Sequence, residues 1–224
     1  MKIISNFVFL FLLTIISFDC FSQPSNGLAS AKQKLATGKS ITDILTDPQF
    51  DSLRTETEFR DLIRSYSNQK VVTLVTDKEP GTKITIKGKM LDQNKQPLKN
   101  LLIYVYHTDT RGWYGSDRVH FQMMEGDRKH ARLFAYLHTN EAGGFEFTTI
   151  QPHGYPQSEL PAHIHFEVFN GTGQSLLITE LLFDDDERLQ GEIRSRSEKE
   201  KFLIAKPISE TDKKVYNYTV ILNQ

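Results

Sequence analysis

The sequence predicts a mainly β protein: an antiparallel β-sandwich core preceded by a small helical N-terminal segment. After about residue 70, apolar residues alternate with polar ones or form short runs, which is the pattern of strands in a half-buried sheet. Before that point Leu, Ile and Phe recur three and four residues apart, which is the pattern of an amphipathic helix. A length of 224 residues fits one large domain with a small appendage.

The composition is that of an ordinary globular chain. Hydrophobic residues make up 38% and charged residues 25%, which excludes collagen-like, wholly disordered and polytopic membrane proteins. The 27 Lys and Arg residues almost balance the 28 Asp and Glu residues. Because no global field then attracts a polyanion, we expect no nucleic-acid partner.

The first residues are typical of a secretory signal peptide. An uncharged apolar run extends from Phe7 to Phe18, and it is shorter than the ~20 residues that a membrane-spanning helix needs. Cys20 and Ser22 are small residues at the positions that signal cleavage requires. We therefore expect residues 1–22 to be removed and the protein to be exported, to a periplasm or out of the cell.

Cys20 permits an alternative interpretation of this segment. It could be a site of lipid attachment, but Asp19 stands directly before it, where lipoprotein signals usually carry a small residue. Cys20 is also the only cysteine of the chain. Cleavage after Ser22 therefore leaves no thiol, which excludes disulfides, thiolate zinc sites and iron–sulfur clusters.

Residues 23–70 are predicted to form the helical segment. Apolar residues there have helical spacing, and Ser40 and Thr55 are candidate helix caps. The segment carries no motif with evident chemistry. We expect it to cover the β domain, and a dimerisation or lipid-facing role is the alternative.

Residues 71–224 are predicted to form one β domain, because no repeat or linker divides them. Turn clusters separate the segments of strand character. The charged stretch 184–201 is expected to form a solvated loop and a short helix. The seven predicted strands are residues 71–76, 82–91, 101–108, 145–150, 163–169, 175–183 and 215–222.

All seven histidines lie between His107 and His165, a crowding that solubility does not require. His163 and His165 flank Ile164 on a predicted strand, so their imidazoles project from one face while Ile164 and Phe166 project from the other. Imidazole is a common ligand of mid-series transition metals. The pair alone also occurs as an ordinary polar pair on a sheet, so a metal site requires further donors.

Oxygen atoms have to supply those donors, because the mature chain lacks cysteine. Several tyrosines qualify, although Tyr104 and Tyr106 lie in a strand-like run where packing is the usual role. His153 could support a ligand or replace one. The carboxylate candidates are Glu159, Glu167 and the aspartates at 184–186, and the histidines expected to face solvent or line a pocket are His107, His120, His130 and His138.

The order of motifs is more specific than any single residue. A turn from Asp92 to Pro97 joins two predicted strands and leads to Gly112-Trp113-Tyr114. A block from Thr139 to Pro152 follows, with Asn at its second position, and then come Tyr155-Pro156 and His163-Ile164-His165. With these motifs the chain resembles the intradiol ring-cleavage dioxygenases, which open catechols with ferric iron. That family usually has Asp where this block has Asn.

The resemblance implies a site and a reaction. Tyr114, Tyr155, His163 and His165 would bind one ferric ion, with hydroxide or water as the fifth ligand. Tyr155 would be the catalytic residue, because the resemblance implies that it lies opposite His165 and leaves the metal when the diol binds. The partners would be a small aromatic diol and O₂, the product a muconate-type diacid, and the assembly a homodimer.

The donor set also suits the charge of ferric iron. Two phenolates and two neutral imidazoles reduce a charge of three plus to one plus, and a hydroxide brings the site to neutrality. A free tyrosine has a pKa of ~10, so it binds as phenolate at neutral pH only because the ion stabilises the deprotonated oxygen.

One departure from the family pattern concerns the substrate. Leu160 stands where relatives often carry an arginine that balances the charge of the oxygenated ring. We therefore expect a neutral diol to be preferred to a carboxylated one. The arginines that could replace the missing one are Arg111, Arg118, Arg128 and Arg132.

Two other classes of function are compatible with parts of the sequence. The strand framework also resembles carboxypeptidase regulatory-like and transthyretin-like sandwiches, which are noncatalytic modules of exported proteins; such a module needs no tyrosine and histidine quartet. A zinc hydrolase using His163, His165 and Glu167 is the third interpretation. It is disfavoured because Glu167 would lie ~6.6 Å further along the strand than His165.

Overall fold

The computed structural model describes residues 26–115, 131–210 and 213–222. The expected signal peptide of residues 1–22 and the lipid-attachment candidate Cys20 lie outside these ranges. So do four further sequence candidates: His120, His130, Arg118 and Arg128. No helix in the described part of the chain is long and apolar enough to cross a membrane.

In the described ranges, nine strands form a single mixed sheet with the order β1-β5-β2-β9-β8-β7-β6-β3-β4. Neighbouring strands are antiparallel except for the pairs β1–β5, β2–β9 and β7–β8, which are parallel. The bounds are β1 (Val71–Thr73), β2 (Lys83–Leu91), β3 (Leu102–His107), β4 (Leu133–His138), β5 (Gly144–Ile150), β6 (His163–Phe169), β7 (Ser175–Phe183), β8 (Leu203–Glu210) and β9 (Lys213–Ile221).

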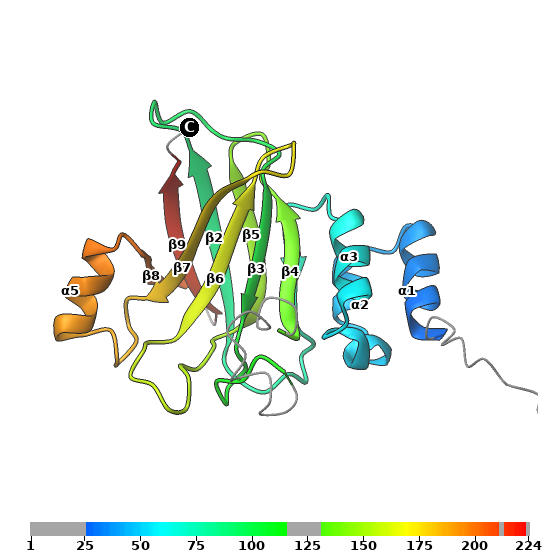
Figure 1. Ribbon diagram of the computed structural model, residues 1–224, viewed down its shortest axis with the longest axis horizontal. Coiled ribbons are helices and arrows are strands. Elements are labelled where there is room, and N and C mark those ends of the chain that lie inside the picture. The colour runs from blue at the N-terminus through cyan, green and yellow to red at the C-terminus, as the bar shows by residue number, and fades with distance from the viewer. Residues whose placement is uncertain (1–25, 116–130, 211–212, 223–224) are drawn as a thin grey trace, which may run out of the picture.

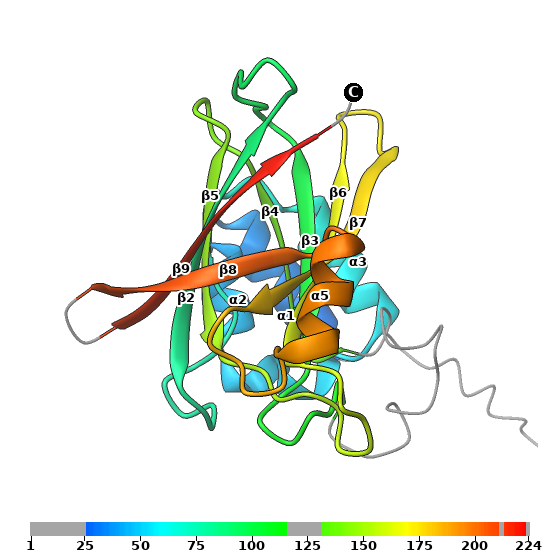
Figure 2. The ribbon, with the colours of Figure 1, turned by 90° about the vertical axis from the view of Figure 1, so that its left-hand side faces the viewer.

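The sheet folds over into two layers and almost closes on itself. β8 makes the turn between layers, because Leu203–Ala205 pair with β7 whereas the strand from Lys206 onward pairs with β9. At the other side, the His138 N–H at the end of β4 donates to the carbonyl of Gln69 just before β1, at 2.8 Å. The predicted fold class, a mainly β sandwich with a small helical segment, is confirmed (Figures 1 and 2).

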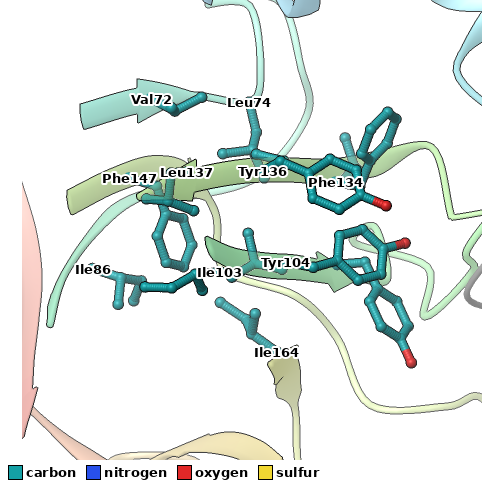
Figure 3. Close-up of a cluster of buried hydrophobic side chains, with 14 of the residues drawn as sticks. Val72, Leu74, Ile86, Ile103, Tyr104, Phe134, Tyr136, Leu137, Phe147 and Ile164 are labelled. Atoms are coloured by element: carbon teal, nitrogen blue, oxygen red, sulfur yellow. The ribbon is translucent and has the colours of Figure 1, made fainter. Parts of the chain in front are cut away.

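Alternate residues of the strands fill the space between the layers. Figure 3 shows Ile86, Ile103, Leu137, Phe147 and Ile164, from five different strands, converging on this core. All five are buried. The ring of Phe147 on β5 lies 5.9 Å from the ring of Phe166 on β6, so β6 turns this face toward the core. The opposite face of β6 points away from this core.

From residue 26 onward, where the description of the chain begins, four short helices precede the sheet: α1 (Asn26–Ala36), α2 (Ile41–Leu45), the 3-10 helix η1 (Pro48–Leu53) and α3 (Thr57–Ser65). Ser40 caps α2 as predicted, because its hydroxyl accepts from Asp43 N–H and the Asp43 carboxylate accepts from Ser40 N–H. The prediction that Thr55 is a cap is wrong. The chain continues the turn of η1 through Thr55, and Glu56 N–H donates to Leu53 C=O at 2.8 Å.

These helices lie beside β4 (Figure 1), and a buried arginine joins them to the sheet. The guanidinium of Arg60 on α3 donates to Tyr104 Oη at 3.0 Å and to the carbonyl of Ala131, and it lies 4.0 Å from the ring centroid of Phe134. Burying a charge is costly unless it is well hydrogen-bonded. Arg60 therefore fixes α3 against β3 and β4.

The loops at the lower end of the sheet in Figure 1 carry the two candidate tyrosine donors, and the two candidate histidines lie at the start of β6. These loops include the chain after β3 and the segment between β5 and β6. Helix α5 (Gly191–Lys199) follows β7 near this end, and it is the short helix predicted within residues 184–201.

Candidate metal centre

β6 sets the direction of both histidines. Ile164 and Phe166 are buried in the core, so His163 and His165 project from the other face of the strand, as predicted. His163 is 5% exposed and its Nδ1 lies 2.8 Å from the carbonyl oxygen of Pro161. A carbonyl only accepts, so Nδ1 carries the proton and the Nε2 lone pair of His163 faces the site.

Two loops bring the tyrosines to this face. Tyr114 follows β3, and Tyr155 lies between β5 and β6. Gly112 lets the loops touch: its φ is 77°, and a Cβ there would collide with the carbonyl oxygen of Gly154. A hydrogen bond of 2.7 Å from Thr108 Oγ1 to the carbonyl of His153 also joins them.

The Tyr114 loop is held from within by Asp109. Its Oδ1 accepts from the N–H groups of Arg111 and Trp113, at 2.8 Å and 3.2 Å. Asp109 is buried, and its other oxygen pairs with the Arg111 guanidinium at 2.6 Å. The side chain of Asp109 thus fixes the turn that directs Tyr114 inward.

The structure brings the four predicted donors together. Tyr114 Oη lies 2.5 Å from Tyr155 Oη and 2.7 Å from His165 Nε2. Tyr155 Oη lies 3.1 Å from His163 Nε2 and 3.5 Å from His165 Nε2. Two donors that bind one transition-metal ion at right angles, at about 2.0–2.1 Å each, are separated by ~2.9 Å. These spacings, together with two oxygen and two nitrogen donors, fit a single ion of intermediate to hard character.

Neighbouring strands supply two further groups around His165. The ring of Tyr106 on β3 stacks on the imidazole, with centroids 4.5 Å apart and an angle of 11°. On β7, Oε1 of Glu180 lies 3.6 Å from His165 Nδ1. Sequence patterns do not indicate Glu180, because only the pairing register of β6 with β7, which sets His165 opposite Glu180, brings it to the site.

The carboxylate candidates from the sequence have other contacts. Asp185 accepts from Tyr216 Oη at 2.8 Å, Asp184 pairs with an arginine of α5, and Asp186 accepts from Ala162 N–H at 2.9 Å. The His163, His165 and Glu180 ligand atoms lie within 4.8 Å of one another, and this group contains neither Glu159 nor Glu167. Among the described residues, the acidic neighbour of the histidines is therefore Glu180.

Tyr104, His138 and His153 lie in other surroundings. Tyr104 bonds to Arg60 and stacks on Tyr136, and burial raises its pKa. His153 lines a separate cavity of about 500 Å³. His138 is half-buried, and burial lowers its pKa.

The prediction that His107 faces solvent or lines a pocket is wrong. His107 ends β3, which lies between β4 and β6, and its side chain is fully buried. Its ring nitrogens lie 2.7 Å from the carbonyl oxygen of Thr108 and 2.7 Å from Thr149 Oγ1. Burial lowers the pKa of the His107 imidazole to about 4.

Both described arginine candidates are committed to other groups. Arg111 pairs with Asp109, and Arg132 pairs with Glu79 at 2.5 Å. An arginine that the sequence patterns do not single out, Arg188, donates to the carbonyl oxygens of Ser158 and Leu160, at 3.1 Å and 3.4 Å. Arg188 therefore stabilises the backbone of residues 158–160, which precede His163 in the chain.

Comparisons with known proteins identify the family of the chain. A family model described as "Dioxygenase" matches residues 58–223. The chain is 31% identical over 124 residues to the protocatechuate 3,4-dioxygenase beta chain of Burkholderia cepacia, covering 50% of this chain and 49% of that protein. It is 26% identical over 124 residues to catechol 1,2-dioxygenase 2 of Acinetobacter lwoffii, covering 48% and 42%. The chain thus spans about half the length of the curated relatives it matches.

Solved structures share the fold at lower sequence identity. The catechol 1,2-dioxygenase of Acinetobacter sp. ADP1 superimposes with a TM-score of 0.54 at 16% identity, over 88% of this chain and 77% of that one. The family model covers well over half of the chain, and both curated relatives are named as dioxygenases, one of protocatechuate and one of catechol. The chain belongs to the intradiol ring-cleavage dioxygenase family.

Proposed function

We propose that the protein is a non-haem ferric dioxygenase that inserts O₂ into a catechol-type diol, with intradiol cleavage to a muconate-type diacid. The observation that carries the proposal is the convergence of two phenol oxygens and two imidazole nitrogens at 2.5–3.5 Å. The names of the curated relatives, a protocatechuate and a catechol dioxygenase, support the substrate class.

The proposed ligands are Tyr114, Tyr155, His163 and His165, and their chemistry fits ferric iron. Hard phenol oxygens favour the trivalent ion, and neutral imidazoles complete the set without excess negative charge. Bound iron would supply a Lewis acid that stabilises the phenolates and the deprotonated diol.

Tyr155 is the proposed proton acceptor. Its ring is half-buried on a loop, whereas Tyr114 is 1% exposed and fixed by the turn at Asp109. Tyr155 can therefore move more readily, and as a phenolate its oxygen would take one of the two diol protons, while the hydroxide expected as the fifth ligand would take the other. His163 stays in place because Pro161 holds its Nδ1–H.

A cavity beside His163 suits a small ring. It has a volume of about 330 Å³, near the lower end of the range for ligand pockets. Its wall is half apolar and half polar or charged, and of the four proposed ligands only His163 lines it. The apolar residues that line it are Leu160, Pro161, Leu182, Ile193 and Phe202.

Iron analysis and visible absorption test the proposal. The protein, purified with iron available, is expected to hold one iron per chain and to show a visible phenolate-to-iron charge-transfer band, and both are lost in Tyr114→Phe. Tyr66→Phe, which removes a phenol at the end of α3, is the control and keeps both. A colourless, metal-free wild type contradicts the proposal and favours a noncatalytic sandwich module, and colourless protein with bound zinc favours a hydrolase.

Export is a second, separate part of the proposal. The apolar run Phe7–Phe18 and the small residues Cys20 and Ser22 support it. Mass spectrometry of the protein recovered from its producing cells should find a chain that begins at Gln23. Retention of residues 1–22 in cell extract contradicts the proposal, and a lipid on Cys20 favours anchoring.

A further inference from the structure

The two proposed histidine ligands differ in the group that faces their second ring nitrogen. Nδ1 of His163 faces a neutral group, the Pro161 carbonyl oxygen, at 2.8 Å. Nδ1 of His165 faces a carboxylate oxygen of Glu180 at 3.6 Å. This distance is longer than a hydrogen bond but within direct electrostatic contact.

Glu180 is held there by the sheet and not by a flexible loop. Strand β7 pairs with β6 so that His165 and Glu180 are directly opposite each other, and both side chains leave the same face. On the other side of β6, the register sets Tyr106 opposite His165, and the Tyr106 ring stacks on the imidazole. The ring of His165 is therefore positioned by groups on both neighbouring strands.

The carboxylate of Glu180 has the imidazole of His165 as its electrostatic partner. In the part of the chain that the structure describes, no lysine or arginine forms an ion pair with Glu180. Its side chain is 31% exposed and that of His165 is 19% exposed, so water screens their contact only in part. A carboxylate beside Nδ1 favours the tautomer that keeps its proton there and leaves Nε2 free to bind.

We infer that Glu180 is a positioning residue that fixes His165 and makes it the stronger electron donor of the two imidazoles. The inference rests on the proposed function, because it requires that Nε2 of both histidines bind iron. A negative charge behind one imidazole raises the electron density that this ligand gives to the metal. It also gives the site two chemically unequal histidines, each facing the tyrosines through Nε2.

Two substitutions separate the charge of Glu180 from its shape. Glu180→Gln keeps an acceptor of the same size but removes the charge, and Glu180→Ala removes both. Glu200→Gln is the matched control, because Glu200 lines the same cavity as Glu180 but does not belong to the group of ligand atoms around His165. The iron affinity, by competition with a chelator, and the position of the visible band are measured for each protein.

Glu180→Ala is expected to weaken iron binding by about 10-fold or more, the usual effect of removing a group that supports a ligand. In Glu180→Gln the band should move to longer wavelength, because a more electron-poor iron accepts an electron from phenolate at lower energy. Glu200→Gln should match the wild type. A purely structural role would instead lower thermal stability in Glu180→Ala without moving the band in Glu180→Gln.

Unchanged affinity and band position in both Glu180 variants would overturn the inference. An equal shift in Glu200→Gln would overturn it too, because the effect would then be one of general charge. If Glu180→Ala does not fold, the band of Glu180→Gln decides. A wild type that binds no iron defeats the proposed function, and the inference with it, whereas a normal wild type with unaffected variants defeats the inference alone.

Discussion

Acidification should destabilise the fold through His107. The imidazole is fully buried and uses both ring nitrogens, toward Thr108 and Thr149. Burial lowers its pKa to about 4, from an ordinary value of 6.5. Between these values the unfolded chain binds a proton that the folded chain does not, so stability falls as pH falls. The contribution of His107 to the free energy of unfolding is complete above pH 6.5 and is lost progressively as the pH falls to about 4.

The size of the effect follows from the same values. Each unit of pKa difference corresponds to about 1.4 kcal/mol, so His107 contributes about 3 kcal/mol that acid removes. This is a large fraction of the 5–15 kcal/mol typical of a domain. Urea unfolding of the wild type at pH 7.5 and pH 4.5 measures the total change in the free energy of unfolding.

A variant isolates the part that belongs to His107. In His107→Gln, the drop in unfolding free energy between the two pH values should be smaller than in the wild type by about 2–3 kcal/mol. His153→Gln, which removes an exposed ring, is the control and should keep the wild-type drop. Parallel pH dependence in the wild type and His107→Gln would show that the buried imidazole is not the source of the acid sensitivity.

Three further outcomes are expected. Gly112→Ala should destroy iron binding, because a Cβ collides with Gly154 and the positive φ costs a further ~1 kcal/mol or more; wild-type iron content in this variant would contradict the role of the loop contact. Arg60→Ala should lower the free energy of unfolding by about 3–5 kcal/mol in a urea titration, because it leaves buried acceptors unpaired and bares the Phe134 ring; a change below ~1 kcal/mol would contradict the anchoring role. Because Leu160 offers no charge, O₂ uptake should be faster with catechol than with protocatechuate, and equal turnover would contradict the preference.

Much of the fold can be predicted from local patterns, and the failures have local causes. The sequence does not predict β4, because nearly all residues of this strand are buried and it lacks the alternation that marks a half-exposed strand. β8 contains Pro207, which usually argues against a strand. The structure accommodates this proline close to Lys206, where β8 changes partner from β7 to β9.

In the candidate site, the four donor residues could be predicted from the sequence, but the neighbouring Glu180 could not. The order of motifs is enough to indicate the family that the chain resembles, and that resemblance implies Tyr114, Tyr155, His163 and His165, whose donor atoms converge in the fold. Glu180 cannot be identified in this way, because its closeness to His165 depends on the register between two strands that are joined by a turn.

His107 and Asp109 show a second limit of the sequence. Whether a histidine is buried depends on which strands flank its own, and β3 is an internal strand. Asp109 carries no motif of its own, yet it fixes the Tyr114 turn. Residues that hold a site in place are hard to predict, because their partners lie in the backbone of the same loop.

Labelled oxygen provides the decisive test of the proposed ring cleavage. Iron-loaded wild-type protein is mixed with catechol under ¹⁸O₂, and the products are analysed by mass spectrometry. Intradiol cleavage places both atoms of one O₂ molecule in a muconate-type diacid, so we expect a doubly labelled acid that is absent with Tyr155→Phe and with Tyr114→Phe. Unreacted catechol, or a product labelled in any way other than two carboxylate oxygens of that acid, would contradict the proposed reaction.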